Sequence, residues 1–258
     1  SPARRKDPMP TILITGASSG LGAEMARQFA AKGYDLALAA RRVERLEELR
    51  HEIHALDPDR RVEIRALDVT DDDAVFEVFR AFAEDFGTLD RIIINAGLGK
   101  GARLGTGKYY ANRQTAMTNF VAALCQAEAA MEIFRAQKRG HLVFISSVSA
   151  MRGMPKALNV YAATKAGVAH LAEGLRSEMQ ATPGLDIVVS TIYPGYIRSE
   201  MNSYVESAPF MVDTETGVRA IVDAIEAEKA DARVPSWPWW PMGTVMRYAP
   251  LGVVRRLM

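Results

Sequence analysis

The sequence predicts an α/β protein in which a mainly parallel sheet carries helices on both faces. Within residues 11–97, four short apolar runs are separated by three longer amphipathic segments. Glycine or polar residues directly follow each apolar run. Strands that alternate with helices form parallel sheets through right-handed crossovers, and ligands bind at the carboxyl ends of such strands. We therefore expect a doubly wound sheet with its site along that edge.

Composition favours one domain. The chain has 258 residues, 48% of them hydrophobic, which is enough for a sizeable core. We expect a single domain over residues 9–236, a disordered leader or expression remnant over residues 1–8, and a separate tail over residues 237–258. The net charge of +1 comes from interspersed acids and bases, so nucleic acid is not an expected partner. The single cysteine, Cys125, excludes an internal disulfide and favours the cytoplasm.

The first unit is a strand from Thr11, a glycine-rich turn and a helix whose apolar residues recur at fourfold spacing. The turn has glycines in the pattern G-x-x-x-G-x-G. Small residues let the backbone approach a ligand, and amides at a helix start attract phosphate. An ordinary tight turn is the alternative. The expected phosphate-binding residues are Gly16, Ser18, Ser19, Gly20, Leu21 and Gly22.

The second strand, residues 35–39, runs into Arg41 and Arg42, and a helix follows. The end of this strand is where the adenosine ribose of a dinucleotide would lie. A carboxylate there selects NAD, whereas a guanidinium can hold the 2′-phosphate of NADP. The two arginines therefore predict NADP(H), unless they only solvate the start of the helix.

Strands are also expected at residues 62–67 and 89–94, with a helix between them. Asp68 and Val69 follow the first of these strands. Asn95, Ala96 and Gly97 follow the second, and small residues there would let a cofactor ring pass close to the sheet edge.

A long apolar helix is expected over residues 109–137, with Asn119 in its middle. A buried asparagine needs hydrogen-bond partners, so a purely structural role stands beside a chemical one. Strand 142–145 then ends in a serine pair that includes Ser147. In the next helix, Tyr161 and Lys165 lie four residues apart on one face. A nearby ammonium favours the phenolate, although this pattern also occurs by chance in amphipathic helices.

Strand 187–192 leads into Pro194 and Gly195, and a helix over residues 214–228 and a strand over residues 232–235 complete the unit. The apolar residues within 201–212 recur with no clear helical or strand period, which favours a mobile lid over an apolar pocket. The apolar residues expected near that pocket are Met154, Tyr196, Met201, Tyr204, Phe210 and Met211.

Taken in this order, the glycine-rich turn, Asn95-Ala96-Gly97, the serine pair, Tyr161-x-x-x-Lys165 and Pro194-Gly195 resemble the short-chain dehydrogenase/reductase family in its compact single-domain form. The resemblance implies a seven-stranded Rossmann sheet and a nicotinamide cofactor. It also implies homodimers or homotetramers built partly from the long helices.

The resemblance further implies a catalytic quartet of Asn119, Ser147, Tyr161 and Lys165. Tyr161 would act as the acid, Ser147 would hold the carbonyl oxygen, Lys165 would lower the tyrosine pKa, and Asn119 would anchor a water. Two departures stand out. Tyr161 lies fourteen positions after Ser147, one more than the family pattern, so we expect an insertion within residues 151–160, with Ser149 as the alternative serine. The implied cofactor residues also include Asp68, Val69, Asn95, Ala96, Gly97, Tyr161, Lys165, Pro194, Gly195, Ile197 and Ser199. Lys165 would hold the nicotinamide ribose, and Ser199 stands where the family usually has threonine.

The expected activity is therefore NADP(H)-dependent interconversion of a carbonyl and an alcohol on an apolar small molecule. The same fold also hosts epimerases and enoyl reductases, and a cofactor-binding sensor without turnover is a further alternative. His and Cys residues lack ligand spacing, so no metal site is expected. The tail holds all three tryptophans, three arginines and no acid; it could cover the pocket, contact a second subunit, anchor to a membrane surface or simply pack.

Overall fold

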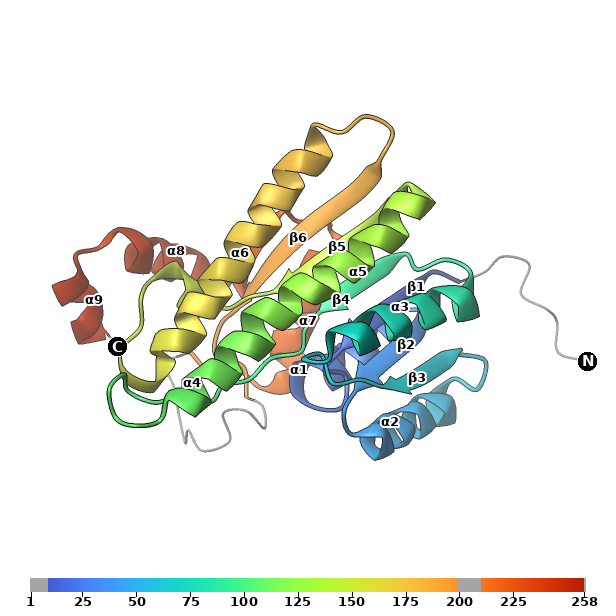
Figure 1. Ribbon diagram of the computed structural model, residues 1–258, viewed down its shortest axis with the longest axis horizontal. Coiled ribbons are helices and arrows are strands. Elements are labelled where there is room, and N and C mark those ends of the chain that lie inside the picture. Colours follow the sequence, from blue (N-terminus) through green and yellow to red (C-terminus); the bar gives the residue numbers. More distant parts are fainter. Residues whose placement is uncertain (1–8, 199–209, 258) are drawn as a thin grey trace, which may run out of the picture.

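The computed structural model describes residues 9–198 and 210–257 of the chain. Its centre is a seven-stranded parallel sheet in the order β3-β2-β1-β4-β5-β6-β7 (Figure 1). The predicted parallel, doubly wound α/β fold is confirmed. The strands are β1 (Thr11–Thr15), β2 (Asp35–Ala40), β3 (Val62–Ala66), β4 (Arg91–Ile94), β5 (Arg139–Ile145), β6 (Asp186–Pro194) and β7 (Asp231–Val234).

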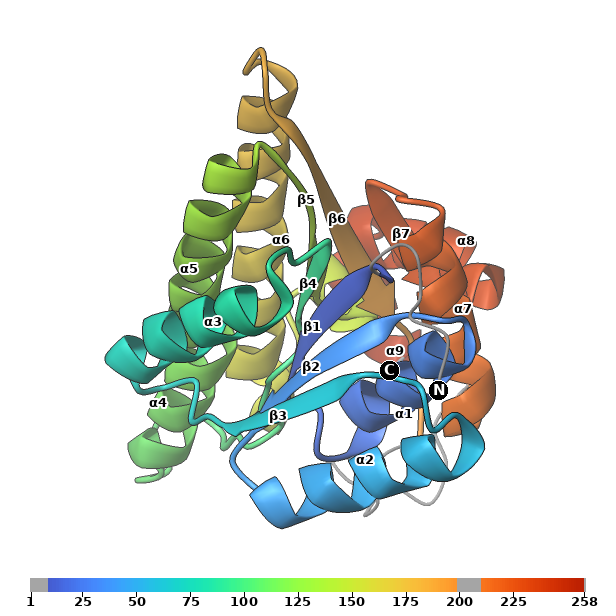
Figure 2. The same ribbon diagram turned by 90° about the vertical axis from the view of Figure 1, so that its right-hand side faces the viewer.

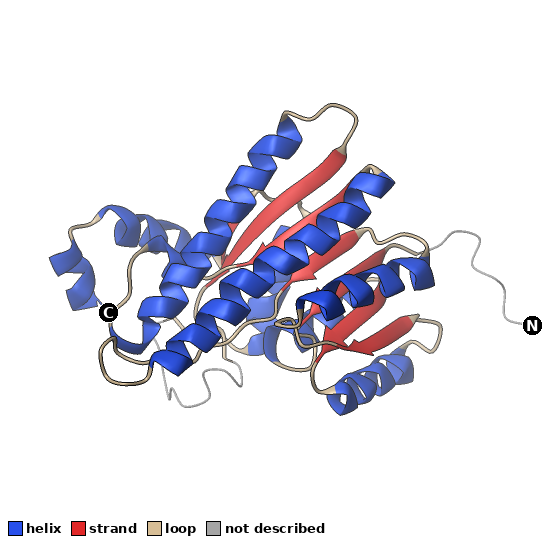
Figure 3. Cartoon of the chain, in the orientation of Figure 1, coloured by secondary structure: helices blue, strands red, loops and turns tan. Residues whose placement is uncertain are grey.

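Helices cover both faces of the sheet, as Figures 2 and 3 show. One face carries α1 (Gly20–Ala31), α2 (Val43–Leu56) and α7 (Thr214–Glu226). The other carries α3 (Asp72–Phe86), α5 (Ala122–Gln137) and α6 (Asn159–Gln180). The other described helices are α4 (Tyr109–Ala116), η1 (Met117–Val121), η2 (Val148–Met151), η3 (Lys156–Leu158), α8 (Ser236–Tyr248) and α9 (Leu251–Leu257).

The central strands β1, β2 and β4 are mainly apolar because both of their faces are covered. In β1, Ile12 and Ile14 point into the core beneath α1 and α2, whereas Leu13 points into the core beneath α3 and α5. All three side chains are fully buried. The chain runs outward in both directions from β1, which pairs with β2 on one side and β4 on the other. This reversal leaves a crevice at the carboxyl ends of β1 and β4.

The helix expected over residues 109–137 is present, but it is not regular. Residues Met117–Val121 form a π-helical turn in which the amide of Ala122 donates to the carbonyl of Met117. Such turns insert one extra residue per turn and often occur at functional sites. Asn119 lies within this turn, so the irregularity falls on a predicted site residue.

The tail folds into two helices, α8 and α9, with Pro250 between them, and a proline at this position cannot continue the helix because it has no amide hydrogen. Residues 201–209 of the predicted lid lie outside the described residues. At the described end of that segment, Val212 pairs with the buried Ile197 in a parallel bridge. The amides of Arg198 and Val212 donate to the carbonyls of Val212 and Tyr196 across this bridge.

Candidate active site

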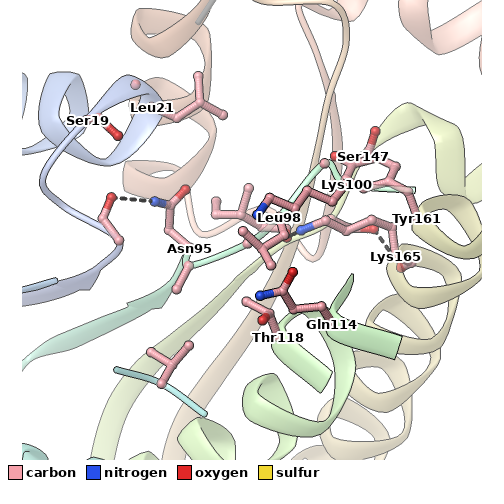
Figure 4. A pocket seen from close by; sticks show the side chains of 18 of the residues that line it. Ser19, Leu21, Asn95, Leu98, Lys100, Gln114, Thr118, Ser147, Tyr161 and Lys165 are labelled. Carbon is pink, nitrogen blue, oxygen red and sulfur yellow. Dashed lines mark hydrogen bonds between the residues drawn. The ribbon is translucent and has the colours of Figure 1, made fainter. Parts of the chain in front are cut away.

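A cavity of about 1100 Å³ lies at the carboxyl ends of the strands and brings most of the predicted site residues together. In Figure 4, Ser19, Leu21 and Asn95 lie on one side and Ser147, Tyr161 and Lys165 on the other. The predicted residues that line it are Gly16, Ser18, Ser19, Gly20, Leu21, Arg41, Arg42, Asp68, Val69, Asn95, Ala96, Gly97, Ser147, Tyr161, Lys165, Pro194, Gly195 and Ile197.

The glycine-rich turn is held against the end of β4 by one asparagine and one threonine. Asn95 donates from Nδ2 to the carbonyls of Thr15 (3.1 Å) and Gly16 (3.3 Å). In return, the Thr15 hydroxyl accepts from the amides of Asn95 and Ala96. Gly16 has a φ of +63°, which favours glycine. These bonds fix the turn, so its amides at the start of α1 are positioned before any phosphate binds.

Gly22 is needed for a different reason from the other glycines of the turn. It does not line the cavity, and a Cβ atom there would lie 2.3 Å from the Gly16 carbonyl oxygen. Gly22 therefore lets the first turn of α1 pack closely on the strand end. Gly22 was predicted as a cofactor-binding residue, and from this position it would act by shaping the turn and not by lining the cavity.

Arg41 and Arg42 border the cavity at the end of β2, as the sequence predicted. Asp68 lies on the same border and accepts from the amide and hydroxyl of Thr70 at 3.0 and 2.7 Å. These bonds, with a smaller contribution from the charge of Arg41, hold the pKa of the Asp68 carboxyl below its usual value. The cationic side chains at this end of the cavity thus have one ionised acid nearby.

Tyr161 and Lys165 lie on one face of α6, four residues apart. Lys165 donates from Nζ to the carbonyl of Ile145 at 3.0 Å, and Nζ lies 5.8 Å from the centre of the Tyr161 ring. The lysine is only 6% exposed. Burial lowers the pKa of Lys165 to about 8, because removal from water disfavours the ammonium.

Ser147 follows β5 and faces the same cavity as Tyr161. Its Oγ accepts from the amide of Ser149 at 3.1 Å, and this bond fixes the hydroxyl at the start of η2. The neighbouring Ser146 instead donates to the Lys165 carbonyl at 2.8 Å, which ties the strand end to α6. Ser149, the alternative serine, also lines the cavity.

Asn119 lies behind the cavity wall and is 1% exposed. Its Oδ1 accepts from the Leu98 amide at 2.7 Å, and its Nδ2 donates to the Leu98 carbonyl at 2.8 Å and to Thr164 Oγ1 at 3.3 Å. A Cβ atom on Gly97 would lie 3.3 Å from Asn119 Oδ1 and 3.6 Å from Lys165 Nζ. Asn119 therefore holds the loop after β4 close to the lysine, which fits the structural role left open for it.

The apolar residues expected around the substrate divide into three groups. Tyr196 and Met211 line the cavity. Met154 does not, since it packs with Ala162 and Met246 in a small core cluster beside the tail. Phe210 also lies off the cavity and stacks edge-on against Trp239. Met201, Tyr204 and the predicted cofactor residue Ser199 lie outside the described residues.

One wall of the cavity was not predicted from the sequence. It is formed by the loop after β4 and by one face of α4 and η1, from which Gln114 and Thr118 project in Figure 4. Gln114 and Thr118 lie four residues apart and therefore share a helix face. Polar residues on a helix usually indicate a face exposed to solvent, so this pattern did not point to a cavity. The missed lining residues include Leu98, Gly99, Lys100, Tyr110, Arg113, Gln114, Met117 and Thr118.

The tail supports the cavity from behind. Trp239 of α8 is 2% exposed and stacks edge-on against Tyr196, with ring centres 5.2 Å apart. A Cβ atom on Gly195 would lie 2.0 Å from Trp239 Nε1. The indole thus packs directly on the backbone of the Pro194-Gly195 wall.

Comparison with known proteins agrees with this arrangement. Two strains of Mycobacterium tuberculosis carry an uncharacterized oxidoreductase that is 51% identical over 245 residues, covering 95% of this chain and 96% of the relative. The structure of a short-chain dehydrogenase from Sphingobium yanoikuyae in complex with NADPH matches with a TM-score of 0.80 at 27% identity. The match covers 97% of this chain and 95% of that one.

A short-chain dehydrogenase/reductase from Burkholderia phymatum, in complex with NAD, has the same fold, with a TM-score of 0.80 at 20% identity and coverage of 96% and 92%. The family model for short chain dehydrogenases matches residues 10–209, which include the turn, the serine pair and the Tyr161-Lys165 helix. The chain is an oxidoreductase of the short-chain dehydrogenase/reductase family.

Proposed function

We propose that this protein is an NADP(H)-dependent oxidoreductase that interconverts a carbonyl and an alcohol, with Tyr161 as the general acid and base. One observation carries the proposal. A single cavity contains the glycine-rich turn on one side and Ser147, Tyr161 and Lys165 on the other. A dinucleotide bound along this cavity would bring its nicotinamide ring close to Tyr161, whose side chain can donate or accept a proton.

When bound, the nicotinamide supplies or accepts a hydride. The protein supplies the rest. In the reductive direction, Tyr161 donates its phenolic proton to the substrate oxygen, while the Ser147 hydroxyl donates a hydrogen bond to the same oxygen. Lys165 stabilises the tyrosinate that remains, since its ammonium lies beside the ring. In the oxidative direction the same groups act in reverse.

The preference for NADP(H) rests on Arg41 and Arg42. Both border the cavity at the end of β2. Neither position carries an acid, which would favour the ribose hydroxyls of NAD. The fold itself does not decide the cofactor, since one related structure contains NADPH and another NAD. The two arginines are therefore the residues to test.

The cavity also supports an apolar substrate. Its lining includes Met117, Leu158, Tyr196 and Met211, whose side chains favour a substrate with a hydrocarbon body. Lys100 and Gln114 also line the cavity and can hold a polar group of such a molecule.

We further propose a homodimer or homotetramer in a reducing compartment such as the cytoplasm. Phe120, Val121 and Leu124 are each between 36% and 39% exposed on the long helix, and a second copy would cover them. Burial raises the pKa of the Cys125 thiol to about 11, so this thiol is unreactive and serves packing.

Binding without turnover is the second candidate. A paired titration with NADPH and NADH, followed by loss of the nicotinamide absorbance with a panel of ketones, aldehydes and quinones, separates the two. Tighter binding of NADPH together with turnover supports the reductase. Tight binding with no turnover on any member of the panel favours a sensor, and tighter binding of NADH overturns the role given to the arginines.

A further inference from the structure

The end of the molecule that carries the tail is built from sequence without acids. Residues 91–127, 133–172 and 232–258 contain none of the 31 acidic residues of the chain. The exposed or partly exposed bases that these segments contribute there are Lys100, Arg103, Lys108, Arg113, Arg152, Lys156, Arg247, Arg255 and Arg256. We call this set the basic end.

Two contacts link segments of the basic end to one another. Arg103 and Lys156 line the same hollow with Leu104 and Asn159. Arg152 donates from Nη1 to the Arg247 carbonyl at 3.1 Å, which joins η2 to α8. In Figure 1, α8, α9 and the start of α4 lie toward one end of the long axis, and α2 lies toward the other.

The bases of this end have no acidic partner among residues 9–198 and 210–257, because no ion pair recorded there includes any of them. Several arginines outside the basic end are paired with acids. Arg27 contacts Glu24 and Glu52, and Arg135 contacts Glu178 at 2.7 Å. The positive charge of the basic end is therefore not neutralised within the described chain.

Large apolar side chains are exposed on the same surface. Trp237 is 78% exposed, Trp240 64% and Tyr248 75%, although Trp239 between them is buried. Leu251 and Val253 of α9 and Leu104, Tyr109 and Tyr110 near α4 are also exposed. Burial of Trp239 and Val254 anchors the tail helices, so these exposed side chains belong to a packed element with a fixed outer face.

We propose that the basic end docks on the surface of a lipid bilayer that contains anionic lipid. Tryptophan and tyrosine favour the headgroup region of a bilayer, and arginines beside them attract anionic headgroups. The chain would lie on the surface, because α8 and α9 have 13 and 7 residues, too few to span a bilayer. Among the described residues no helix is long and apolar enough to cross a membrane.

The charge argues against a second copy of the chain as the occupant. In a two-fold contact the same patch lies on both sides, so the bases of one copy would face those of the other. Like charges in such a contact oppose association. The exposed apolar side chains of Phe120, Val121 and Leu124 on the long helix are not surrounded by a cluster of bases, so that surface is better suited to a second copy.

Docking in this way would turn the cavity mouth toward the lipid. Lys100, Tyr110 and Arg113 belong both to the cavity lining and to the exposed surface of this end. An apolar substrate dissolved in the bilayer would then reach the site without crossing water. The docking itself does not depend on the proposed reaction and is tested without substrate.

The test is co-flotation of the full chain with vesicles of phosphatidylcholine, with and without phosphatidylserine. We expect recovery with the anionic vesicles only, and loss of it as salt rises from about 0.1 M to about 1 M, where the screening length falls from about 10 Å to about 3 Å. Equal recovery with both vesicle types, or with neither, overturns the proposal.

Two variants address the two parts of the surface. Arg255→Gln with Arg256→Gln should lower vesicle partitioning by about fivefold for each arginine removed. Trp237→Ser with Trp240→Ser should lower it further. The matched controls are Arg80→Gln with Lys229→Gln, which remove two exposed charges outside the basic end, and Leu56→Ser, which removes a side chain that is 90% exposed on α2.

The controls should bind vesicles like the unchanged protein, and all variants should keep its thermal unfolding midpoint. Equal loss in the controls would show that partitioning does not use the basic end. Sedimentation velocity in the absence of lipid completes the test. If the tryptophan variant changes the molar mass of the protein in solution, a second copy covers this surface and the proposal is wrong.

Discussion

The ammonium nitrogen of Lys165 lies 5.8 Å from the centre of the Tyr161 ring. The lysine reaches this place because its Nζ donates to the Ile145 carbonyl at the end of β5, while the helix places the tyrosine one turn away. The strand end and the helix thus position the two groups together. A buried cation beside a phenol is the arrangement that favours proton release at moderate pH.

Lys165 should leave a signature in the pH dependence of stability. Its pKa in the folded protein is about 8, below the ordinary value of 10.5, so the unfolded chain binds more protons between these values. The cost of burying the ammonium is fully present below about pH 8 and is removed as pH rises toward 10.5. We expect the free energy of unfolding of the unchanged protein to rise relative to that of Lys165→Met across this window.

Urea unfolding of both proteins at a series of pH values measures this difference. The subtraction removes the contributions of other titrating groups, which the two proteins share. If the free energies of unfolding of the two proteins differ by a constant amount from pH 8 to pH 10.5, the pKa of Lys165 is not lowered by burial.

The arginines at the end of β2 should set the choice of cofactor. A charge-assisted hydrogen bond to phosphate contributes about 1.5–3 kcal/mol, so Arg41→Ala and Arg42→Ala should each lower the preference for NADPH over NADH by about tenfold or more. NADH affinity should change little. Isothermal titration with both cofactors gives the ratio.

Arg50→Ala is the matched control, since Arg50 lies on α2 and pairs with Glu47 on the same helix. It should leave the ratio unchanged. An unchanged ratio in the Arg41 and Arg42 variants as well would mean that other residues hold the 2′-phosphate.

Gly195 and Trp239 should be energetically coupled. A Cβ atom on Gly195 would overlap the indole nitrogen, so Gly195→Ala should destabilise the protein by about 1–3 kcal/mol. In Trp239→Leu the smaller side chain leaves room for the methyl group. The double variant should therefore be more stable than the sum of the single effects predicts.

Chemical denaturation of the four proteins in this cycle measures the coupling. Additive effects would mean that the contact between the tail and the Pro194-Gly195 wall does not constrain either residue. A coupling of about 1 kcal/mol or more supports the tail as part of the cavity wall.

The sequence predicted the sheet and the positions of most site residues because both depend on local signals. Strands buried on both faces are continuous apolar runs, and site residues such as Asn95 and Ser147 directly follow those runs. The Tyr161-Lys165 pair needs only helical spacing. These patterns are contained in short stretches of chain.

What could not be predicted depends on contacts between distant segments. The polar face of α4 lines the cavity because the loop after β4 brings it over the strand ends, whereas its sequence resembles a solvated face. The place of Trp239 against Gly195 joins two segments whose proximity no local pattern encodes. Met154 was expected at the substrate for its apolar character, and it packs against the tail instead.

The measurement that tests the central claim most directly is NADPH oxidation by the unchanged protein and by Tyr161→Phe, side by side, on a panel of apolar carbonyl compounds. We expect turnover by the unchanged protein, and a loss of about 10²-fold or more in the variant with nearly unchanged NADPH affinity, because general acid catalysis contributes about 10² to 10⁴-fold. Equal turnover in both proteins would contradict the assignment of Tyr161 as the acid.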